Sequence, residues 1–197
     1  MPNNKERILA VSRQLFLHHG YNGISIRKIA SKARLTTGAI YFHFKNKRDI
    51  YETICLEALD MLTGKFRAVM GKKERIPHKL ISTFDSYLSF YYNTRDYYNI
   101  LMEYKAEYDA EGEGGKEDIT RKMKELLTIV METIQRGIDG GDFRETNPML
   151  LALFLAAVGE GMLQYKKIGL LSSMKIEDRE FRKFIADVIG RGIEKGR

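Results

Sequence analysis

The chain has 197 residues, of which 44% are hydrophobic and 30% charged, a composition that excludes a disordered or fibrous protein. Cys55 is the single cysteine, so an intramolecular disulfide is excluded and nothing indicates an oxidising compartment. The first residues lack the apolar stretch of a signal peptide, and the longest apolar run, 149–158, is too short to span a bilayer. We therefore expect a soluble, cytoplasmic protein that does not insert into a membrane.

The net charge of +7 is unevenly distributed along the chain. Residues 1–50 contain 10 Lys and Arg against 2 Asp and Glu, whereas residues 51–197 contain 23 against 24. A basic segment joined to a near-neutral body is typical of a protein that binds a polyanion, because Lys and Arg displace the counterions of phosphates. On charge alone the polyanion is either nucleic acid or a membrane surface.

The first fifty residues predict three short helices. Apolar residues repeat at helical spacing over 5–19, and Gly20 is a suitable stop. Ser25 and Thr36 are good N-cap residues for two further helices, the second of which ends near Phe44. Two short helices joined by a tight turn at Arg34 form a helix-turn-helix. The sequence therefore predicts a compact three-helix module at 1–48.

The rest of the chain, 49–197, predicts six more helices without a domain linker between them. Asn46 caps a long helix that ends at Gly71, with Asp49 at its third position. The other expected helices span 77–92, 95–108, 116–139, 148–167 and 177–190. Helix formers dominate and β-branched alternation is nearly absent, so we expect an all-α protein of about nine helices.

One face of the helix that follows Thr36 is suited to entering a DNA groove. If Ile40 and Phe44 point inward, Gly38 and Phe42 point outward. Thr37 can hydrogen-bond to a base edge, the side chains of Ala39 and Phe42 can meet a thymine methyl, and Gly38 permits close approach. Polar and basic neighbours can contact phosphates. The candidate DNA-binding residues are Ser25, Thr36, Thr37, Gly38, Ala39, Tyr41, Phe42, His43, Lys45 and Lys47.

Residues 21–47, YNGISIRKIASKARLTTGAIYFHFKNK, closely resemble the DNA-binding signature of the tetracycline-repressor (TetR) family. The resemblance implies a C-terminal ligand-binding and dimerisation domain at 49–197. It also implies a homodimeric repressor that binds a palindromic operator and is released by a small molecule, although the sequence does not exclude an activator. Arg34 departs from the pattern, because relatives usually have glycine in this turn. Arg34 must therefore adopt or avoid a positive φ, and its side chain can add a phosphate contact.

Aromatic residues cluster in the body of the chain. Seven of the 11 tyrosines lie between Phe84 and Tyr108. Such a cluster is compatible with a pocket for a hydrophobic or aromatic effector and equally with an ordinary core. The candidate pocket residues are Leu62, Phe66, Phe84, Tyr87, Leu88, Tyr91, Met102, Leu127 and Met131.

The last two expected helices are candidates for a dimer interface. The segment 149–158 is apolar nearly all round, so it must be covered on two sides. The final helix repeats apolar residues at Phe181, Phe184, Ile185, Val188 and Ile189. Paired with the same helices of a second copy they would form a four-helix interface. Packing within one chain is the alternative.

No catalytic or metal-binding pattern is found in the sequence. Ser172-x-x-Lys175 matches a β-lactamase fragment whose partner motifs are missing. The four histidines lack metal-ligand spacing, so we expect no catalytic residues, no metal and no cofactor. Two alternatives to a DNA-binding regulator remain. One is a helical interaction protein whose basic segment docks on acidic proteins or membranes, and the other is a helical lipid-binding or catalytic protein.

Overall fold

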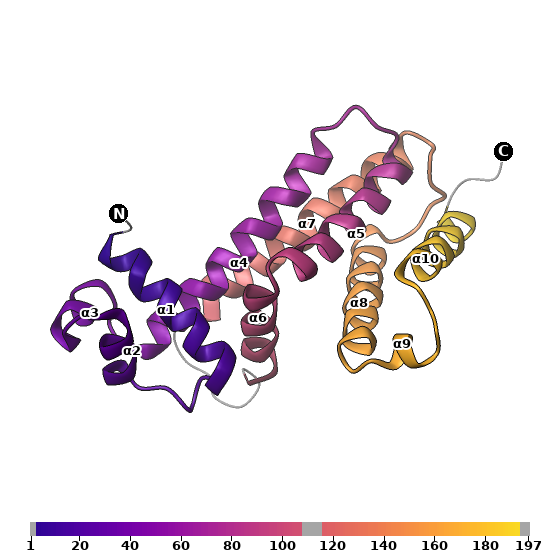
Figure 1. Ribbon diagram of the computed structural model, residues 1–197. Helices are drawn as coiled ribbons and strands as arrows, with labels where there is room; N and C mark the ends of the chain where they lie inside the picture. The colour runs from indigo at the N-terminus through magenta and orange to yellow at the C-terminus, as the bar shows by residue number, and fades with distance from the viewer. Residues whose placement is uncertain (1–2, 108–115, 194–197) are drawn as a thin grey trace. The chain divides into compact units, whose positions relative to one another are not determined.

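The computed structural model describes residues 3–107 and 116–193 (Figure 1). Within these ranges the chain forms ten helices and no strand, which confirms the expected all-α fold. The acidic, glycine-rich stretch 109–115 and the expected helix end at Tyr108 lie outside the described residues. The chain divides into two compact units. Unit 1 is Met1–Met61 with Tyr92–Met123, and unit 2 is Leu62–Tyr91 with Lys124–Arg197.

The second and third helices begin where their capping residues predict, and the first ends at Gly20 as expected. In α1 (Asn4–His19), Asn3 and Glu6 form a reciprocal capping box, and Gly20 ends the helix with a φ of 66°. The Ser25 side chain accepts a hydrogen bond from the Lys28 amide at the start of α2 (Ile26–Ala33). These caps satisfy backbone N–H groups that have no partner inside the helix. The same device, at Thr36, starts α3 (Thr37–His43).

The three helices enclose a small apolar core in unit 1. Ile8, Phe16, Ile29 and Ile40 have no exposed surface, and Phe44 is nearly as buried. Their spacing places one apolar stripe of each helix on the shared core. The helix-turn-helix is therefore a packed element of unit 1, with its remaining faces exposed to solvent (Figure 1).

Three further segments complete unit 1. These are the first part of α4 (Lys47–Met70), the helix α6 (Arg95–Glu107) and the first part of α7 (Lys116–Asp139). The ring of Tyr51 packs edge-on against Phe16 of α1 at a centroid distance of 4.9 Å, and its hydroxyl donates to the Ile100 carbonyl at 3.2 Å. Because both partners of Tyr51 are buried, α1, α4 and α6 are held in one core.

Unit 2 is built on α5 (Ile76–Asn93), the later part of α7 (Lys116–Asp139) and α8 (Pro148–Lys167). Leu80, Ile134, Phe143 and Ala152 form its buried cluster. A Cβ at Gly137 would lie 2.3 Å from Cδ2 of the Phe143 ring, so α7 can pack here only because residue 137 has no side chain.

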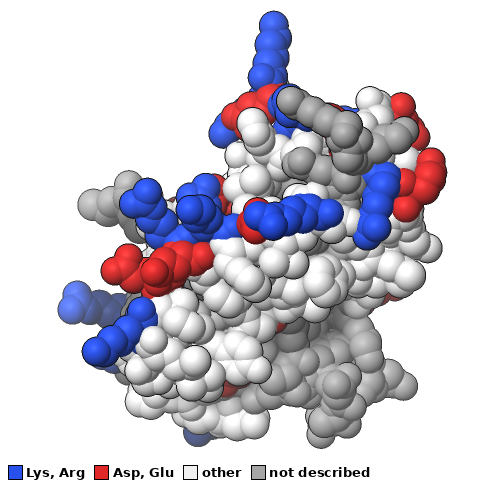
Figure 2. Space-filling view, turned by 90° about the vertical axis from the view of Figure 1, so that its right-hand side faces the viewer, with Lys and Arg blue, Asp and Glu red and all other residues white. Residues whose placement is uncertain are grey.

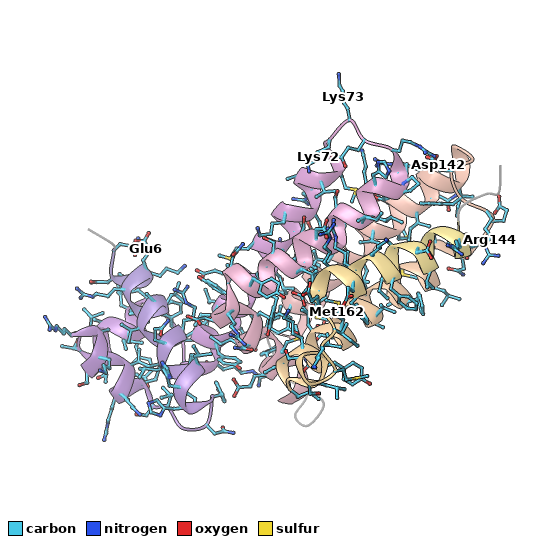
Figure 3. The ribbon with its side chains drawn as sticks, turned by 45° about the vertical axis from the view of Figure 1, so that its right-hand side comes forward. Glu6, Lys72, Lys73, Asp142, Arg144 and Met162 are labelled. Atoms are coloured by element: carbon cyan, nitrogen blue, oxygen red, sulfur yellow. The ribbon has the colours of Figure 1, made fainter. Side chains whose placement is uncertain are left out.

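The turns of unit 2 carry charged side chains outside this core. Arg75, at the start of α5, donates to Asp142 at 3.1 Å, and so joins the turn after α4 to the turn after α7. Lys72 and Lys73 extend from the turn after α4 (Figure 3). The Arg75–Asp142 pair contributes little to stability, since surface ion pairs are worth about 1 kcal/mol or less.

The apolar helix α8 is covered on one side only within the described chain. Pro148 occupies its first turn, where the helix was expected to begin, and the structure adds a cap at Asn147. Ala152, Gly159, Met162 and Leu163 are buried in unit 2, whereas Phe154 is 56% exposed. α8 is the one described helix long and apolar enough to pass a composition test for a membrane span, a test that core helices of soluble proteins also pass. In the most apolar 18-residue stretch of α8, 22% of the residues are buried.

The structure adds one helix to the nine expected. The four-residue α9 (Leu170–Ser173) lies between α8 and α10 (Asp178–Ile193), in the stretch that contains Ser172 and Lys175. One turn is too short to show helical periodicity, which is why the sequence did not indicate it. Lys175 takes a φ of 57° directly after this turn. The stretch is therefore a short connection between two longer helices.

Candidate nucleic-acid interface and effector pocket

The outward face of α3 is as exposed as the helical geometry predicts. Ile40 and Phe44 are buried, and Phe42 on the opposite side is 85% exposed. Tyr41 is 57% exposed, and Thr37 and Gly38 are exposed beside it. An exposed aromatic side chain adds little hydrophobic stabilisation to the fold, and these two adjacent rings are accessible to a partner.

Gly38 is not required by the packing of the chain itself. A Cβ added there would have one neighbour within 4 Å, the Thr36 hydroxyl oxygen at 3.8 Å, and the backbone does not take a positive φ. At Gly23, in contrast, a Cβ would lie 2.3 Å from the His19 carbonyl oxygen. Glycine inside a helix costs about 1 kcal/mol relative to alanine. The fold therefore explains Gly23 and does not by itself require glycine at position 38.

The turn between α2 and α3 shows how the chain accommodates an arginine at a glycine position. Arg34 adopts the left-handed conformation, with φ 52° and ψ 47°, and its amide bonds to the Ala30 and Ser31 carbonyls. This conformation costs a non-glycine residue about 1–2 kcal/mol. The exposed Arg34 side chain adds a positive charge to the basic three-helix segment at 1–48, here called the head.

Positive charge surrounds this exposed face. Arg27, Lys28 and Lys32 are exposed on α2, and Lys45 is exposed after α3. The Ser25 and Thr36 hydroxyl oxygens each accept one amide hydrogen bond, at 3.2 and 3.1 Å, so their hydroxyl protons remain to be donated. Such donors and cations fit phosphate oxygens.

Lys47 has a role within the fold that the sequence did not reveal. Its ammonium donates to the Tyr21 carbonyl at 2.8 Å and the Ile24 carbonyl at 3.0 Å, and it lies 4.0 Å from the centroid of the Tyr21 ring. These contacts tie the loop before α2 to the start of α4. Lys47 thus fixes the geometry of the head whether or not it also meets a phosphate. His43 is half-buried, with its ring 5.0 Å from that of Phe42.

Polar contacts between α1 and α6 were also missed from the sequence. The Gln14 amide donates to Asp96 at 2.7 Å, and the Arg13 guanidinium lies 4.3 Å from the centroid of the Tyr97 ring. The Tyr97 hydroxyl donates to Glu57 at 3.0 Å, and burial, followed by the Glu57 charge, raises the pKa of Tyr97. No local pattern indicates such contacts, because the partners lie on different helices, far apart in the chain.

The candidate pocket residues are divided between the two units. Met102 belongs to unit 1 and the other eight to unit 2. Leu62, Phe66, Leu88 and Tyr91 are buried, whereas Met131 packs against the core cluster around Ile134. A Cβ at Gly159 of α8 would lie 3.4 Å from the Phe84 ring and 3.6 Å from the Tyr87 ring. Of these candidates, Phe84 and Tyr87 therefore pack against α8 in unit 2.

A charged group adjoins the aromatic residues. The Tyr87 hydroxyl donates to Glu160 of α8, and the Gln164 amide donates to the other oxygen of that carboxylate at 2.7 Å. Glu160 is half-buried, so these donors compensate part of its lost hydration. The sequence did not indicate Glu160, because a single acidic residue on an apolar helix has no pattern.

Comparison with known proteins agrees with this geometry. Residues 8–54 match the family model described as bacterial regulatory proteins, tetR family. The HTH-type transcriptional regulator QacR of Staphylococcus aureus is 32% identical over 110 residues, which are 54% of this chain and 56% of that protein. The chain thus matches just over half the length of this relative.

Solved structures share the whole arrangement of helices. A protein of unknown function from Rhodococcus sp. RHA1 superposes with a TM-score of 0.84 at 17% identity, over 99% of this chain and 97% of that one. The TetR family transcriptional regulator PfmR from Thermus thermophilus gives 0.77 at 19% identity over 100% of both chains. At these identities the likeness shows the fold. With the match at residues 8–54, it shows that this chain has the helix-turn-helix of the tetR family of bacterial regulatory proteins on a fold that these structures share.

Proposed function

We propose that the protein is a ligand-responsive transcriptional repressor that binds double-stranded DNA through α3. The observation that carries this proposal is the outer face of α3, where Phe42 and Tyr41 are exposed and Gly38 leaves an open surface. A short helix with this face fits the major groove, and the surrounding cations and hydroxyls hold it on the phosphates. We place base contacts at Thr37, Ala39 and Phe42.

The proposed DNA-binding form is a homodimer, because one short recognition helix reads too few base pairs alone. The uncovered face of unit 2 supports a second copy as the partner. Large hydrophobic side chains are exposed on two of its helices, namely Leu150, Leu153 and Phe154 on α8 and Phe184 and Val188 on α10. Figure 2 looks onto the side that carries these helices and shows a broad area without charged side chains. The side chain of Ile189 lies outside the described residues.

The proposed signal is a small hydrophobic or aromatic molecule bound in the cytoplasm. The aromatic residues Phe84 and Tyr87 against α8 support this class of effector, and α4, which contributes to both units, is the element that would transmit its binding. An effector releases the operator only if it favours a conformation that DNA does not. Effector and operator must then weaken each other's binding by the same factor.

The proposed function is tested by selecting bound sites from random duplexes with the full chain. We expect the selected sites to contain an inverted repeat whose two halves are about one helical turn apart, roughly 34–36 Å, or somewhat more. Sedimentation of the free protein should show a dimer at the same concentration. A monomer that enriches no inverted repeat would contradict the proposal, and binding to acidic vesicles instead of duplexes would favour a membrane-docking protein.

Two lysines of the head should respond differently to substitution. Lys45→Ala is expected to lower the slope of log affinity against log salt by about 1 and to leave the free energy of unfolding unchanged, because Lys45 is exposed. Lys47→Ala should also destabilise the fold, by about 1–3 kcal/mol, because it leaves two carbonyls of the head without their donor. The measurements are fluorescence anisotropy at several salt concentrations and urea unfolding. Equal unfolding midpoints for both variants would show that the Lys47 contacts do not stabilise the fold.

A further inference from the structure

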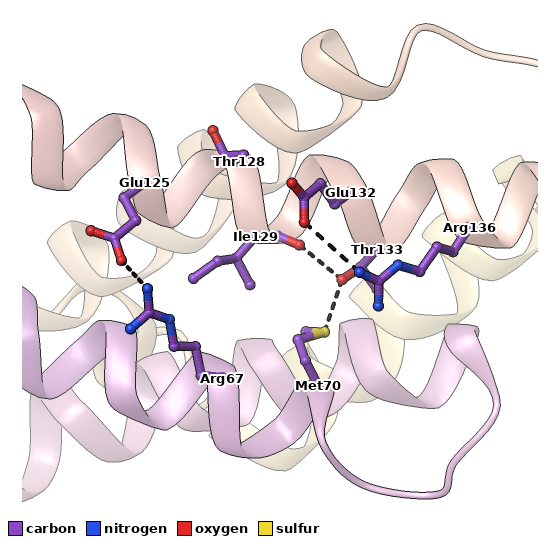
Figure 4. A pocket seen from close by; sticks show the side chains of 8 residues that line it. All are labelled: Arg67, Met70, Glu125, Thr128, Ile129, Glu132, Thr133 and Arg136. Carbon is purple, nitrogen blue, oxygen red and sulfur yellow. Dashed lines mark hydrogen bonds and ion pairs between the residues drawn. The ribbon is translucent and has the colours of Figure 1, made fainter.

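A groove between α4 and α7 in unit 2 shares no lining residue with the candidate DNA interface or with the candidate effector pocket. It has a volume of about 400 Å³, within the range of small-molecule sites. Its lining residues are Arg67, Met70, Glu125, Thr128, Ile129, Glu132, Thr133 and Arg136 (Figure 4). None of them belongs to the nine pocket candidates or to the DNA-binding residues, so the groove is a separate feature of the molecule.

The middle of the groove is apolar. Ile129 points into it from α7, and Met70 faces it from α4 (Figure 4). Thr133 is buried, and its hydroxyl donates within the protein, to the Ile129 carbonyl or to the Met70 sulfur, each at 2.8 Å. The hydroxyl proton is therefore used inside the protein, and this part of the groove offers a ligand mainly an apolar surface.

The two ends of the groove differ in how their charges are satisfied. At one end Arg67 donates to Glu125 at 2.5 Å, so this pair closes the groove with a direct hydrogen bond. At the other end Arg136 and Glu132 are 3.8 Å apart, too far for a hydrogen bond. Their side chains are 66% and 56% exposed. This second pair therefore retains hydrogen-bonding capacity for a ligand.

The Arg136–Glu132 pair, called the open pair below, favours some ligand charges over others. An anion that approaches Arg136 meets the negative charge of Glu132 one helical turn away, and a cation that approaches Glu132 meets Arg136. A ligand with both charges close together satisfies both residues at once. We propose that the groove binds a zwitterion with an apolar side chain, of the α-amino acid class. Its carboxylate faces Arg136, its ammonium faces Glu132, and its side chain lies on Ile129 and Met70.

Calorimetric titration of the full chain with three related compounds tests the proposal. L-phenylalanine carries both charges, hydrocinnamate lacks the ammonium, and phenethylamine lacks the carboxylate. Because an exposed ion pair contributes up to about 1 kcal/mol, we expect L-phenylalanine to bind about fivefold more tightly than either analogue. Equal affinities for the three compounds, or no binding of L-phenylalanine at concentrations up to its solubility, would overturn the proposal.

Substitutions at the open pair locate the binding. Arg136→Gln should weaken the binding of L-phenylalanine about fivefold and affect phenethylamine, which has no carboxylate, less. Glu132→Gln should also weaken the binding of L-phenylalanine about fivefold and affect hydrocinnamate, which has no ammonium, less. Arg121→Gln is the matched control, because Arg121 is on the same helix, is also 66% exposed and pairs with Asp118. Unchanged L-phenylalanine affinity in both groove variants would place the binding elsewhere and overturn the proposal. No DNA is used, so either outcome leaves the proposed repressor function to its own test.

Discussion

Gly38→Leu is expected to abolish operator binding while the protein remains folded. The leucine side chain would project from the outer face of α3, where nothing but the Thr36 hydroxyl lies within 4 Å of the first added atom. The fold accepts it, but a DNA groove in close contact cannot. Overpacking costs about 1–3 kcal/mol at each of two half-sites, about 2–6 kcal/mol in all, which corresponds to a loss of roughly 30-fold to more than 10⁴-fold in affinity. Anisotropy with the selected duplex measures the affinity, and circular dichroism checks the fold.

Gly38→Ala separates the two roles of this position. Alanine removes the helix penalty of glycine, so the free energy of unfolding should rise by up to about 1 kcal/mol. Operator affinity should fall, by less than for leucine, because the added methyl group is small. If the leucine variant folds and binds the duplex with unchanged affinity, the outer face of α3 is not in contact with DNA and the assignment of the interface is wrong.

Gly137→Ala is expected to destabilise the protein, although the same change usually stabilises a helix. The new Cβ would lie 2.3 and 2.5 Å from two atoms of the Phe143 ring and 3.0 Å from a methyl group of Ile76. Phe143 is 2% exposed and cannot turn aside without disturbing the core of unit 2. The overpacking should outweigh the helix gain and lower the free energy of unfolding by about 1–2 kcal/mol. Urea unfolding at one fixed protein concentration measures it.

Two further variants test this explanation. Gly64→Ala in α4 is the matched control, because nothing lies within 4 Å of its added atom, and it should stabilise by up to about 1 kcal/mol. In the Phe143→Leu protein, Gly137→Ala should lower the free energy of unfolding by less than it does in the original protein, because the clash is with the aromatic ring. Equal effects of alanine at 64 and 137 would mean that α7 shifts freely and that Phe143 does not fix it.

Local signals in the sequence determined where most helices begin and which face of each is buried. Ser25, Thr36 and Asn147 cap their helices because the chemistry of a cap involves residues two or three positions apart. The inward placement of Ile40 followed from helical geometry, and the basic head followed from counting charges. The family resemblance at 21–47 rested on the same local segment. The DNA contacts and effector pocket assigned from these patterns remain predictions.

Only the tertiary structure decided the features that join distant segments. Lys47 had the pattern of a surface phosphate ligand, and its contacts with the Tyr21 and Ile24 carbonyls appear only when α4 meets the loop before α2. The pairing of α1 with α6, the need for glycine at 137 and the groove beside Arg136 likewise depend on which helices pack together. Caps and periodicity are properties of neighbouring residues, whereas these contacts depend on shape and distance between segments far apart in the chain, which no short pattern encodes.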